Sequence, residues 1–216
     1  MNGWLAVGAA VVAGYLLGGI PFGLIVGRLV GVGDVRQLGS GKTGFTNSLR
    51  TMGWKWAVLV VVGDTAKGVA AVLAGRLISD EPSVAATAAA LAGAAAVLGH
   101  IFPVYAGFRG GRGVATAFGA FLGVSWPAAL VVVAFSIVIL AVFRYASLMS
   151  VVGVFAGFLV VAALVTAERL EWPYLVFALL TMLAVEVSHV GNIRRLIAGT
   201  EPKLGQGGGQ RPTGAH

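Results

Sequence analysis

Long apolar segments constrain this chain more than any other feature of its sequence. They leave charged residues at only 11% of its 216 positions, against 58% hydrophobic residues, whereas a soluble domain carries about 25% charged residues. Too few charges remain to cover a surface in water, so the chain must meet lipid. We predict an all-α fold, a polytopic integral membrane helical bundle, with residues 1–204 as a single transmembrane domain.

Seven apolar segments are candidate spans of this bundle: 4–30, 56–78, 84–105, 113–125, 127–143, 148–166 and 172–188. Most approach the roughly 20 residues that cross a bilayer core, and Gly18, Gly19 and Pro21 should kink the first. Segment 113–125 is short, because it would rise only about 20 Å as a helix. The sequence therefore predicts seven transmembrane helices, or five if residues 113–143 form a re-entrant pair.

Basic residues favour alternate loops between these segments. Loops 31–55, 106–112 and 144–147 and the region after residue 188 carry most of the Lys and Arg, whereas loops 79–83 and 167–171 are mainly acidic. The positive-inside rule then places the N-terminus outside and the C-terminus in the cytoplasm. The glycine-rich tail, residues 205–216, has no apolar period and is predicted to be disordered.

Glycine and cysteine usage narrow the possibilities further. The 33 glycines lie within apolar runs, where small residues allow helix backbones to approach closely in lipid. The chain contains no cysteine, which excludes a disulfide framework, a thiolate nucleophile and a Cys-based metal site. The formal net charge of +7 fits either ordinary inside-positive loops or the binding of an anionic substrate or lipid.

The loop GSGKTGFTNSLR, residues 39–50, looks like the end of a nucleotide-binding P-loop. A Walker A motif needs a glycine where Arg36 stands and a preceding buried strand, but a membrane segment precedes this loop. We therefore reject an ATPase, although glycines and a following helix start still suit an anion. A solvated cytoplasmic loop is the alternative. The candidate donors are Ser40, Thr46, Asn47 and Arg50, with Thr46 and Arg50 on one face of a helical turn.

The second basic loop, GHIFPVYAGFRGGRGVATAFG (residues 100–119), combines glycines with arginines. Two guanidiniums separated by a glycine pair could form a fork around a phosphate, and the helix expected near residue 113 would add its positive N-terminus. A tight turn with two anchoring arginines is the alternative, but four glycines exceed what a turn needs. His100 could be a site residue, but a lone histidine at the end of a span is more often packed or interfacial. The candidate phosphate ligands are Gly107, Arg109, Gly110, Gly111, Arg112 and Gly113.

The third basic stretch, SHVGNIRRLIAGTEPKLG, follows the last span. His189 and Asn192 are three residues apart and so share one helical face. His189 is the obvious general-base candidate. Glu201 could simply pair with Arg194 or Arg195. The alternative interpretation of these two arginines is that they anchor the chain at the membrane interface.

Two further sets of polar residues lie within or beside the apolar segments. Asp64 and Lys67 are three residues apart in the second segment, and charged groups at that depth either pair or mark a site. A structural pair is the interpretation we favour. Ser147 and Ser150 lie near the expected inner surface, where serines often serve only as hydrogen-bonding groups between helices.

Taken together, the basic loops closely resemble those of one family, the bacterial PlsY family of acyl-phosphate:glycerol-3-phosphate acyltransferases. The matching stretches run in the family's order from residue 18 to 205: GGIPFGLIVGRL, GSGKTGFTNSLR, GDTAKG, GHIFPVYAGFRGGRGVATAFG, RYASLMS and SHVGNIRRLIAGTEPKLG. The resemblance implies acyl transfer from acyl-phosphate to the sn-1 hydroxyl of glycerol 3-phosphate. It also implies a multi-pass protein of the bacterial cytoplasmic membrane, with the active site at the cytoplasmic face.

Residue roles carried over from the resemblance are expectations for this chain. The expected catalytic set is His189, Asn192, Ser40 and Arg50. The expected phosphate- and substrate-binding set is Thr46, Asn47, Gly107, Arg109, Gly110, Gly111, Arg112, Gly113, Ser147, Ser150, Glu201 and Lys67. No metal and no cofactor are expected. The expected partners are glycerol 3-phosphate, acyl-phosphate and the bilayer. No nucleic acid is expected, and a monomer is plausible. The chain departs from the common pattern at Lys42, Phe45 and Arg112, where Asn, Ala and Lys are usual.

The chemistry of such substrates agrees with the loops. Each substrate phosphate carries a charge near −2 at neutral pH, which demands dense positive charge and backbone N–H groups. An acyl-phosphate has a good leaving group, so no covalent nucleophile is required. The attacking hydroxyl loses its proton either to His189 or to a substrate phosphate, and we favour the phosphate because arginines make a nearby His a weak base. A transporter of small phosphorylated anions is the rival hypothesis.

Overall fold

The computed structural model describes residues 2–204, and within that range it is all helical, with no strand. The predicted disordered tail, residues 205–216, lies outside the described residues. The ten α-helices and two 3-10 turns are α1 (Gly3–Gly19), α2 (Phe22–Leu29), η1 (Val35–Gln37), α3 (Phe45–Met52), α4 (Trp54–Arg76), α5 (Pro82–Ile101), η2 (Val104–Ala106), α6 (Val114–Val124), α7 (Trp126–Phe143), α8 (Ala146–Thr166), α9 (Pro173–Ser188) and α10 (Val190–Ile197).

Each of the seven predicted apolar segments contains a helix of this fold. Five helical stretches of the described chain are long and apolar enough to cross a membrane: 3–29, 54–76, 82–106, 126–143 and 146–166. A sixth arises if α9 and α10, bent by 63°, count as one span. Helix α6 is shorter, with 11 residues, as its sequence predicted. Helix α7 by itself has the length and composition of a membrane span.

The predicted kink in the first segment is confirmed. Helix α1 ends at Gly19 and α2 begins at Phe22. Pro21 lies between them and has no N–H to continue the α1 hydrogen-bond ladder. The break gives the end of this segment a direction of its own, and α2 leads into the first basic loop.

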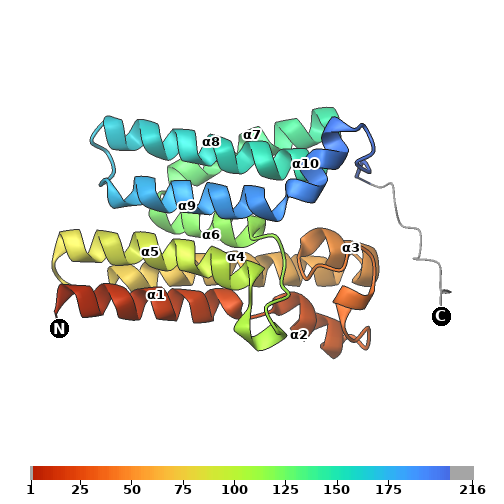
Figure 1. Cartoon of the computed structure of the whole chain (residues 1–216), viewed down its shortest axis with the longest axis horizontal. Coiled ribbons are helices and arrows are strands. Elements are labelled where there is room, and N and C mark those ends of the chain that lie inside the picture. Colours follow the sequence, from red (N-terminus) through yellow and green to blue (C-terminus); the bar gives the residue numbers. More distant parts are fainter. Residues whose placement is uncertain (1, 205–216) are drawn as a thin grey trace.

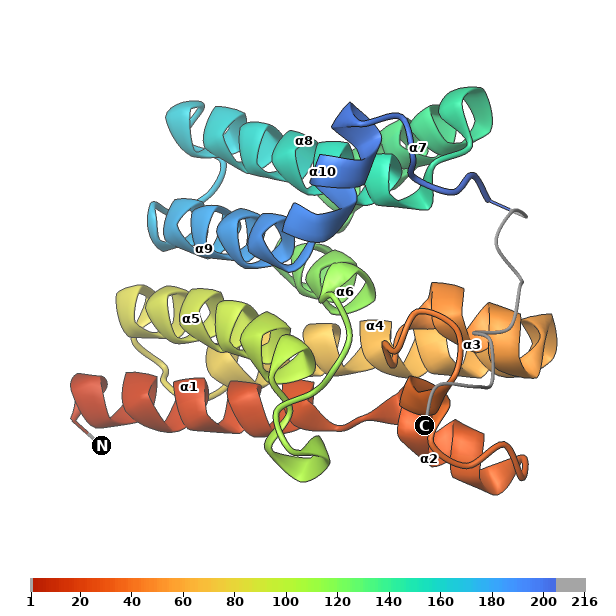
Figure 2. The same cartoon turned by 45° about the vertical axis from the view of Figure 1, so that its right-hand side comes forward.

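The helices pack in two layers, joined through α6 and by direct packing of α5 on α9 (Figures 1 and 2). One layer holds α1, α4 and α5, and the other holds α7, α8 and α9. Glycines allow α1 and α5 to pack closely in the first layer. A Cβ on Gly14 or Gly18 of α1 would collide with the backbone of Ala92 or Ala96 in α5. The predicted use of glycine for close helix approach is therefore confirmed.

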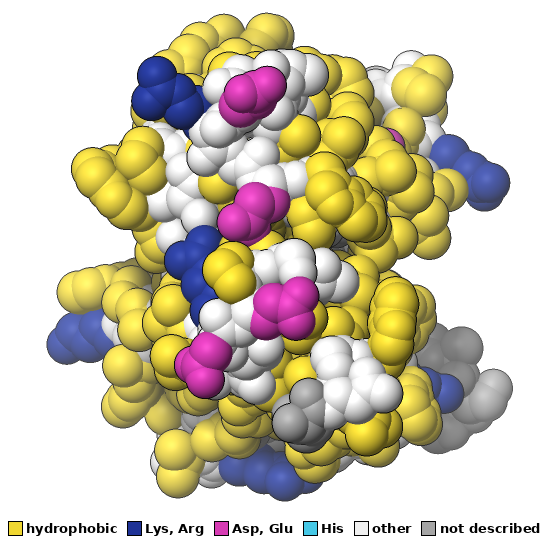
Figure 3. Space-filling model, turned by 90° about the vertical axis from the view of Figure 1, so that its left-hand side faces the viewer, with side chains coloured by type: hydrophobic (Ala, Val, Ile, Leu, Met, Phe, Trp, Pro, Cys, Tyr) yellow, Lys and Arg dark blue, Asp and Glu magenta, His cyan; other side chains and the backbone are white. Residues whose placement is uncertain are grey.

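The two ends of the bundle differ in charge. The connections α4–α5 and α8–α9 meet at one end and carry Asp80, Glu81, Glu168 and Glu171. Figure 3 shows acidic side chains crossing this end between hydrophobic flanks. The opposite end holds α3, α10 and the basic loops (Figure 1). Polar chemistry is thus concentrated at the end away from the acidic loops.

Candidate active site

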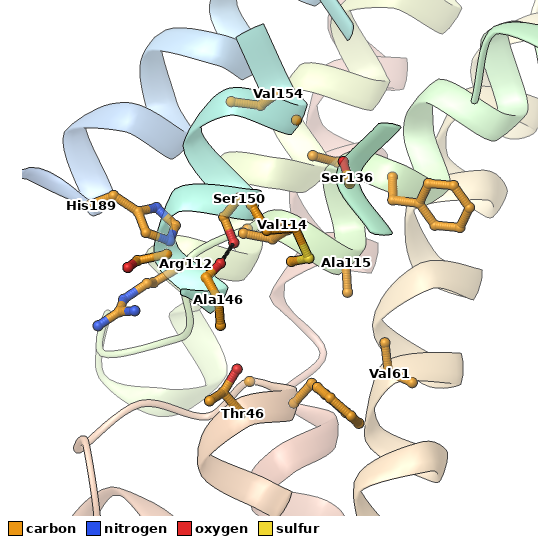
Figure 4. Close-up of a pocket in the computed structure, with 18 of the residues that line it drawn as sticks. Thr46, Val61, Arg112, Val114, Ala115, Ser136, Ala146, Ser150, Val154 and His189 are labelled. Carbon is orange, nitrogen blue, oxygen red and sulfur yellow. Dashed lines mark hydrogen bonds between the residues drawn. The ribbon is translucent and has the colours of Figure 1, made fainter. Parts of the chain in front are cut away.

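A cavity of about 600 Å³ opens where the basic loops meet. Residues from the stretches 40–50, 112–118, 146–154 and 189–202 line it together. Figure 4 shows Thr46 and Val61 on one side, with His189, Ser150 and Val154 across from them. Segments that are far apart in sequence therefore line one cavity, and all three basic loops contribute to it.

The cavity has a polar end and an apolar extension. The polar end carries the basic and hydrogen-bonding residues of the loops. The extension runs between α6, α7 and α8, and its walls include Phe118, Phe121, Val133, Ile137 and Val154. A ligand with a charged head and a hydrocarbon tail matches both parts at once.

Four helices begin at the polar end: α3, α6, α8 and α10. Residues at their starts line the cavity, among them Phe45, Val114, Ala146 and His189. Within residues 2–204, no side chain caps any of these four helix starts. Their free N–H groups and the positive ends of their dipoles all favour an anion in the same space.

The N-terminal wall of the cavity consists of Ser40, Lys42, Thr46, Asn47 and Arg50. Thr46 and Arg50 both lie on α3 and both face the cavity, which confirms the predicted helical turn. The side chains of Ser40, Lys42, Thr46 and Arg50 make no hydrogen bond or ion pair within the described residues. They are therefore free to bind a ligand.

Asn47 lines the cavity but differs from its neighbours on this wall, because its amide is bonded within the protein. Its Nδ2 donates to the carbonyls of Val35 and Lys42, both at 2.8 Å, and to that of Leu38 at 3.3 Å. Its Oδ1 accepts from the backbone N–H of Ser40 at 2.8 Å. Because the amide is buried and fully used, Asn47 shapes the loop that carries Ser40 and Lys42.

The second basic loop brings Arg112 and Gly113 to the cavity, but not Gly107 or Arg109. Gly107 forms an exposed left-handed turn (φ +61°). Arg109 is also exposed, and its carbonyl accepts from Arg36 Nη1 at 3.2 Å. The expected Arg109–Arg112 fork is therefore absent from the described structure, because the turn directs the two arginines to different surroundings.

Arg112 is the arginine of this loop that reaches the site. Its Nε is buried and lacks a hydrogen-bond partner in the described part of the chain. Burial lowers the pKa of its guanidinium, and the negative charge of Glu201 opposes that effect. A buried cation with an unused donor is well suited to bind an anionic ligand.

Gly110 and Gly111 lie behind Arg112 and do not line the cavity. Their N–H groups donate to the carbonyls of Ile101 (3.2 Å) and His100 (3.1 Å) at the end of α5. A Cβ on Gly111 would collide with the His100 ring. These glycines therefore let the loop fold tightly against α5, so that Arg112 and the start of α6 face the cavity.

His189 lies just beyond the end of α9 and is 1% exposed. Its Nδ1 is 2.8 Å from the carbonyl oxygen of Val185, so Nδ1 carries the proton and Nε2 keeps its lone pair. Burial lowers the pKa of His189 to about 4, and the charge of Arg112 acts in the same direction. The ring is therefore neutral at physiological pH and a weak base, as the sequence analysis expected.

The C-terminal wall consists of Ser147, Asn192, Arg195 and Glu201, and the Glu201 carboxylate binds the other three. Oε1 accepts from Ser147 Oγ (2.7 Å) and Asn192 Nδ2 (2.6 Å), and Oε2 accepts from Arg195 Nε (2.7 Å). Burial alone would raise the pKa of Glu201, but these hydrogen bonds outweigh it and hold the pKa below its usual value. The predicted pairing of Glu201 with an arginine is confirmed for Arg195.

Two other expected ligands are engaged within the protein. Lys67 is buried, pairs with Asp64 at 2.9 Å and donates to the carbonyl of Ile20 at 2.9 Å, and it does not line the cavity. Its expected contact with substrate gives way to the structural pair that the sequence analysis favoured. Ser150 lines the cavity, but its hydroxyl donates to the Ala146 carbonyl at 2.8 Å within α8 (Figure 4).

Comparison with known proteins identifies the family. The family model described as glycerol-3-phosphate acyltransferase matches residues 8–199. The chain belongs to this family. Glycerol-3-phosphate acyltransferases similar to it include that of Caulobacter vibrioides, 40% identical over 204 residues (94% of this chain and 90% of the relative). Another is that of Rhodospirillum rubrum, 43% identical over 206 residues (93% and 92%).

Solved structures of the glycerol-3-phosphate acyltransferase family share the fold. PlsY, an integral membrane glycerol 3-phosphate acyltransferase, superimposes in its glycerol 3-phosphate form with a TM-score of 0.81 and 35% identity, covering 92% of this chain and 95% of that one. Its lysophosphatidic acid form gives a TM-score of 0.79 at 34% identity, covering 91% and 94%. This acyltransferase-family chain is thus a multi-pass membrane protein with the PlsY architecture.

Sequence reasoning missed several residues that line the site. Asp64 and His100 face the cavity, although they were interpreted as a structural pair member and a packed histidine. Arg195 was treated as an interfacial anchor or a partner for Glu201, and it also lines the cavity. The available signal was the pair Gly110 and Gly111. Because these residues have no side chains, their backbone can pack directly on the His100 ring and place it beneath the loop.

Proposed function

We propose that this protein transfers an acyl group from acyl-phosphate to the sn-1 hydroxyl of glycerol 3-phosphate. The hydroxyl oxygen attacks the acyl carbonyl carbon, the bond from that carbon to the phosphate oxygen breaks, and the hydroxyl proton leaves with phosphate. The products are 1-acylglycerol 3-phosphate and inorganic phosphate. Family membership supports the acceptor, and the combination of a basic head site with an apolar extension supports a donor that carries both phosphate and a fatty chain.

The polar end of the cavity provides several groups that bind phosphate. Arg50 on α3 and Arg112 before α6 approach the cavity from different segments, and uncapped helix starts surround it. Two dianionic groups held together repel each other, so several cationic and N–H donors are needed to bring them into reacting distance. The same donors stabilise the negative charge that develops on the acyl oxygen during attack.

His189 serves in this proposal as a positioning acceptor rather than as the principal base. With its pKa near 4, it cannot hold a proton well at neutral pH. Its Nε2 lone pair can accept a hydrogen bond from the attacking hydroxyl, while Nδ1 stays on the Val185 carbonyl. A substrate phosphate, with a second pKa of about 6, is the better proton acceptor.

We further propose seven crossings with the N-terminus outside and the active site at the cytoplasmic face of a bacterial inner membrane. The distribution of charge supports this orientation, because acidic connections gather at one end and basic loops at the other. The chain has no native cysteine, so single cysteines at positions 40, 203 and 80 report the orientation directly. Labelling of 40 and 203 from the cytoplasmic side and of 80 from outside is expected. Labelling of 40 and 203 from opposite sides would overturn the proposal.

The activity is tested with purified protein, synthetic acyl-phosphate and glycerol 3-phosphate. We expect release of phosphate that depends on both substrates, together with lysophosphatidic acid. Arg112→Ala should abolish most of the release, whereas Arg109→Ala, outside the cavity, should have a much smaller effect. Uptake of glycerol 3-phosphate into proteoliposomes without product would instead support a transporter and refute the proposal.

A further inference from the structure

A buried cluster of three ionisable side chains lies beneath the loop that carries Arg112. Asp64 Oδ1 is 2.9 Å from Lys67 Nζ and 3.4 Å from His100 Nδ1. The side chains are 2%, 3% and 5% exposed, respectively. Charged groups at such depth are retained only with partners, and here one carboxylate oxygen lies within ion-pair distance of two side chains on different helices, without a well-aligned hydrogen bond to either.

His100 connects this cluster to the glycine loop, residues 110–113. The His100 carbonyl accepts from Gly111 N–H at 3.1 Å, and its ring packs so closely on Gly111 that a Cβ could not fit. The glycine loop ends in Gly113, which precedes the first residue of α6. The position of the His100 ring therefore bears on the backbone that presents both Arg112 and the α6 N-terminus.

Lys67 extends the cluster in the other direction. It donates to the carbonyl of Ile20 at the break between α1 and α2, and it lies 5.9 Å from the centre of the Phe22 ring. The cluster thus spans α4, the end of α5 and the break in the first segment. Asp64 and His100 face the cavity, whereas Lys67 does not.

We propose that Asp64, His100 and Lys67 form a positioning network that fixes the glycine loop and thereby holds Arg112 in the site. Lys67 compensates the charge of Asp64, Asp64 orients the His100 ring through Nδ1, and the ring supports Gly111 from below. Lys67 therefore affects phosphate binding through Asp64 and His100 and not through contact with substrate. The proposal rests on the acyl transfer described above.

The first test distinguishes a positioning role of the network from a contribution to the stability of the protein alone. Asp64→Leu combined with Lys67→Met replaces the buried pair by apolar residues of similar shape, a change that is often neutral or stabilising. We expect the double variant to keep a wild-type-like melting temperature in detergent while kcat/KM falls about 100-fold, as is typical when a binding group is misplaced by about 1 Å. The loss should appear mainly as a raised KM for a phosphate substrate. Wild-type kcat/KM in a stable double variant would overturn the proposal.

The second test concerns His100 alone and does not depend on that double variant folding. The side-chain amide of His100→Asn can occupy the place of Nδ1 and donate to Asp64, whereas His100→Leu has similar bulk and no donor. We expect Asn to retain substantially more kcat/KM than Leu. Equal activity in the two variants would refute the role of the Asp64 link.

Thr181→Val is the matched control for disturbing a buried polar group. Thr181 is 0% exposed, its hydroxyl has no partner among the described residues, and it does not line the cavity. This variant should leave KM and kcat unchanged. Wild-type turnover measured in the same assay distinguishes the two proposals: an inactive wild type refutes acyl transfer, whereas active wild type with unchanged network variants refutes only the network.

Discussion

The two polar walls of the cavity come from opposite halves of the chain and use their side chains differently. On the C-terminal wall, Ser147, Asn192 and Arg195 all bind Glu201, so the positive charge of Arg195 is already matched. On the N-terminal wall, Asn47 alone is engaged, and Arg50 faces the cavity without an ion pair in the described residues.

We infer from this difference that the two walls have different roles. Side chains already bonded to protein fix the shape of the site, and their loss should alter folding together with rate. Side chains with free donors interact with the ligand, and their loss should alter kinetics while stability remains.

The largest expected contrast is between two arginines of opposite walls. Arg50→Ala should lower kcat/KM by about 100- to 1,000-fold, since it removes a free donor from developing negative charge. Arg195→Ala should cost less activity, because it leaves substrate donors in place and removes a partner of Glu201. Phosphate-release kinetics on both variants provide the measurement. A larger loss in Arg195→Ala would show that the walls are not divided in this way.

His189, on the side of the cavity opposite Thr46, should give the next largest effect. His189→Ala is expected to lower kcat about 100-fold, within the range found for groups that assist proton transfer or orientation. His189→Gln offers an acceptor near the position of Nε2 and should recover part of the rate if positioning is the role. Full loss in both variants, with an altered pH profile of the residual rate, would instead favour a base role for His189.

A smaller effect distinguishes the two walls by the melting temperatures of variants in each of them. Glu201→Gln keeps the shape but removes the charge that binds Arg195, and because the Arg195 side chain is 46% exposed this should cost about 1 kcal/mol. It should lower the melting temperature and reduce kcat/KM moderately. Ser40→Ala should raise a substrate KM about tenfold or less, with an unchanged melting temperature. A stability loss in Ser40→Ala alone would reverse the assignment.

The smallest effect concerns acid pH in the absence of substrate. His189 has a folded-state pKa of about 4 against 6.5 for an ordinary histidine, so the unfolded chain binds its proton first as the pH falls. This group therefore favours unfolding progressively from pH 6.5 down to about pH 4. The melting temperature should fall over that window, and less steeply in His189→Gln. An equal slope in both proteins would contradict the buried neutral ring.

Some elements of the site were predictable because their cause is local. The position of α3 followed from a glycine-rich loop and a polar helical turn, and Thr46 and Arg50 do share its inner face. The weak basicity of His189 was expected from neighbouring arginines, but burial is its main cause and Arg112 adds to it from a distant loop. The role of Asn47 was not predictable, because nothing in its sequence neighbourhood tells whether its amide turns into the cavity or back onto its own loop.

Other elements depend on contacts between distant segments. Arg36 donates to the carbonyl of Ala106, 70 positions away, at 2.7 Å, which fixes the turn that carries Arg109 outside the cavity. His100 approaches Asp64 because α5 packs on α4. Neither contact leaves a periodic or compositional signal in the chain.

The sequence alone determined that this protein is a helical membrane bundle with its anion-binding chemistry in a few basic loops, because hydropathy and loop composition are properties of each segment by itself. Which donors remain free for a ligand, by contrast, depends on the folded protein. That outcome depends on which polar groups meet when separate helices pack, and each such meeting removes a donor or acceptor from the cavity.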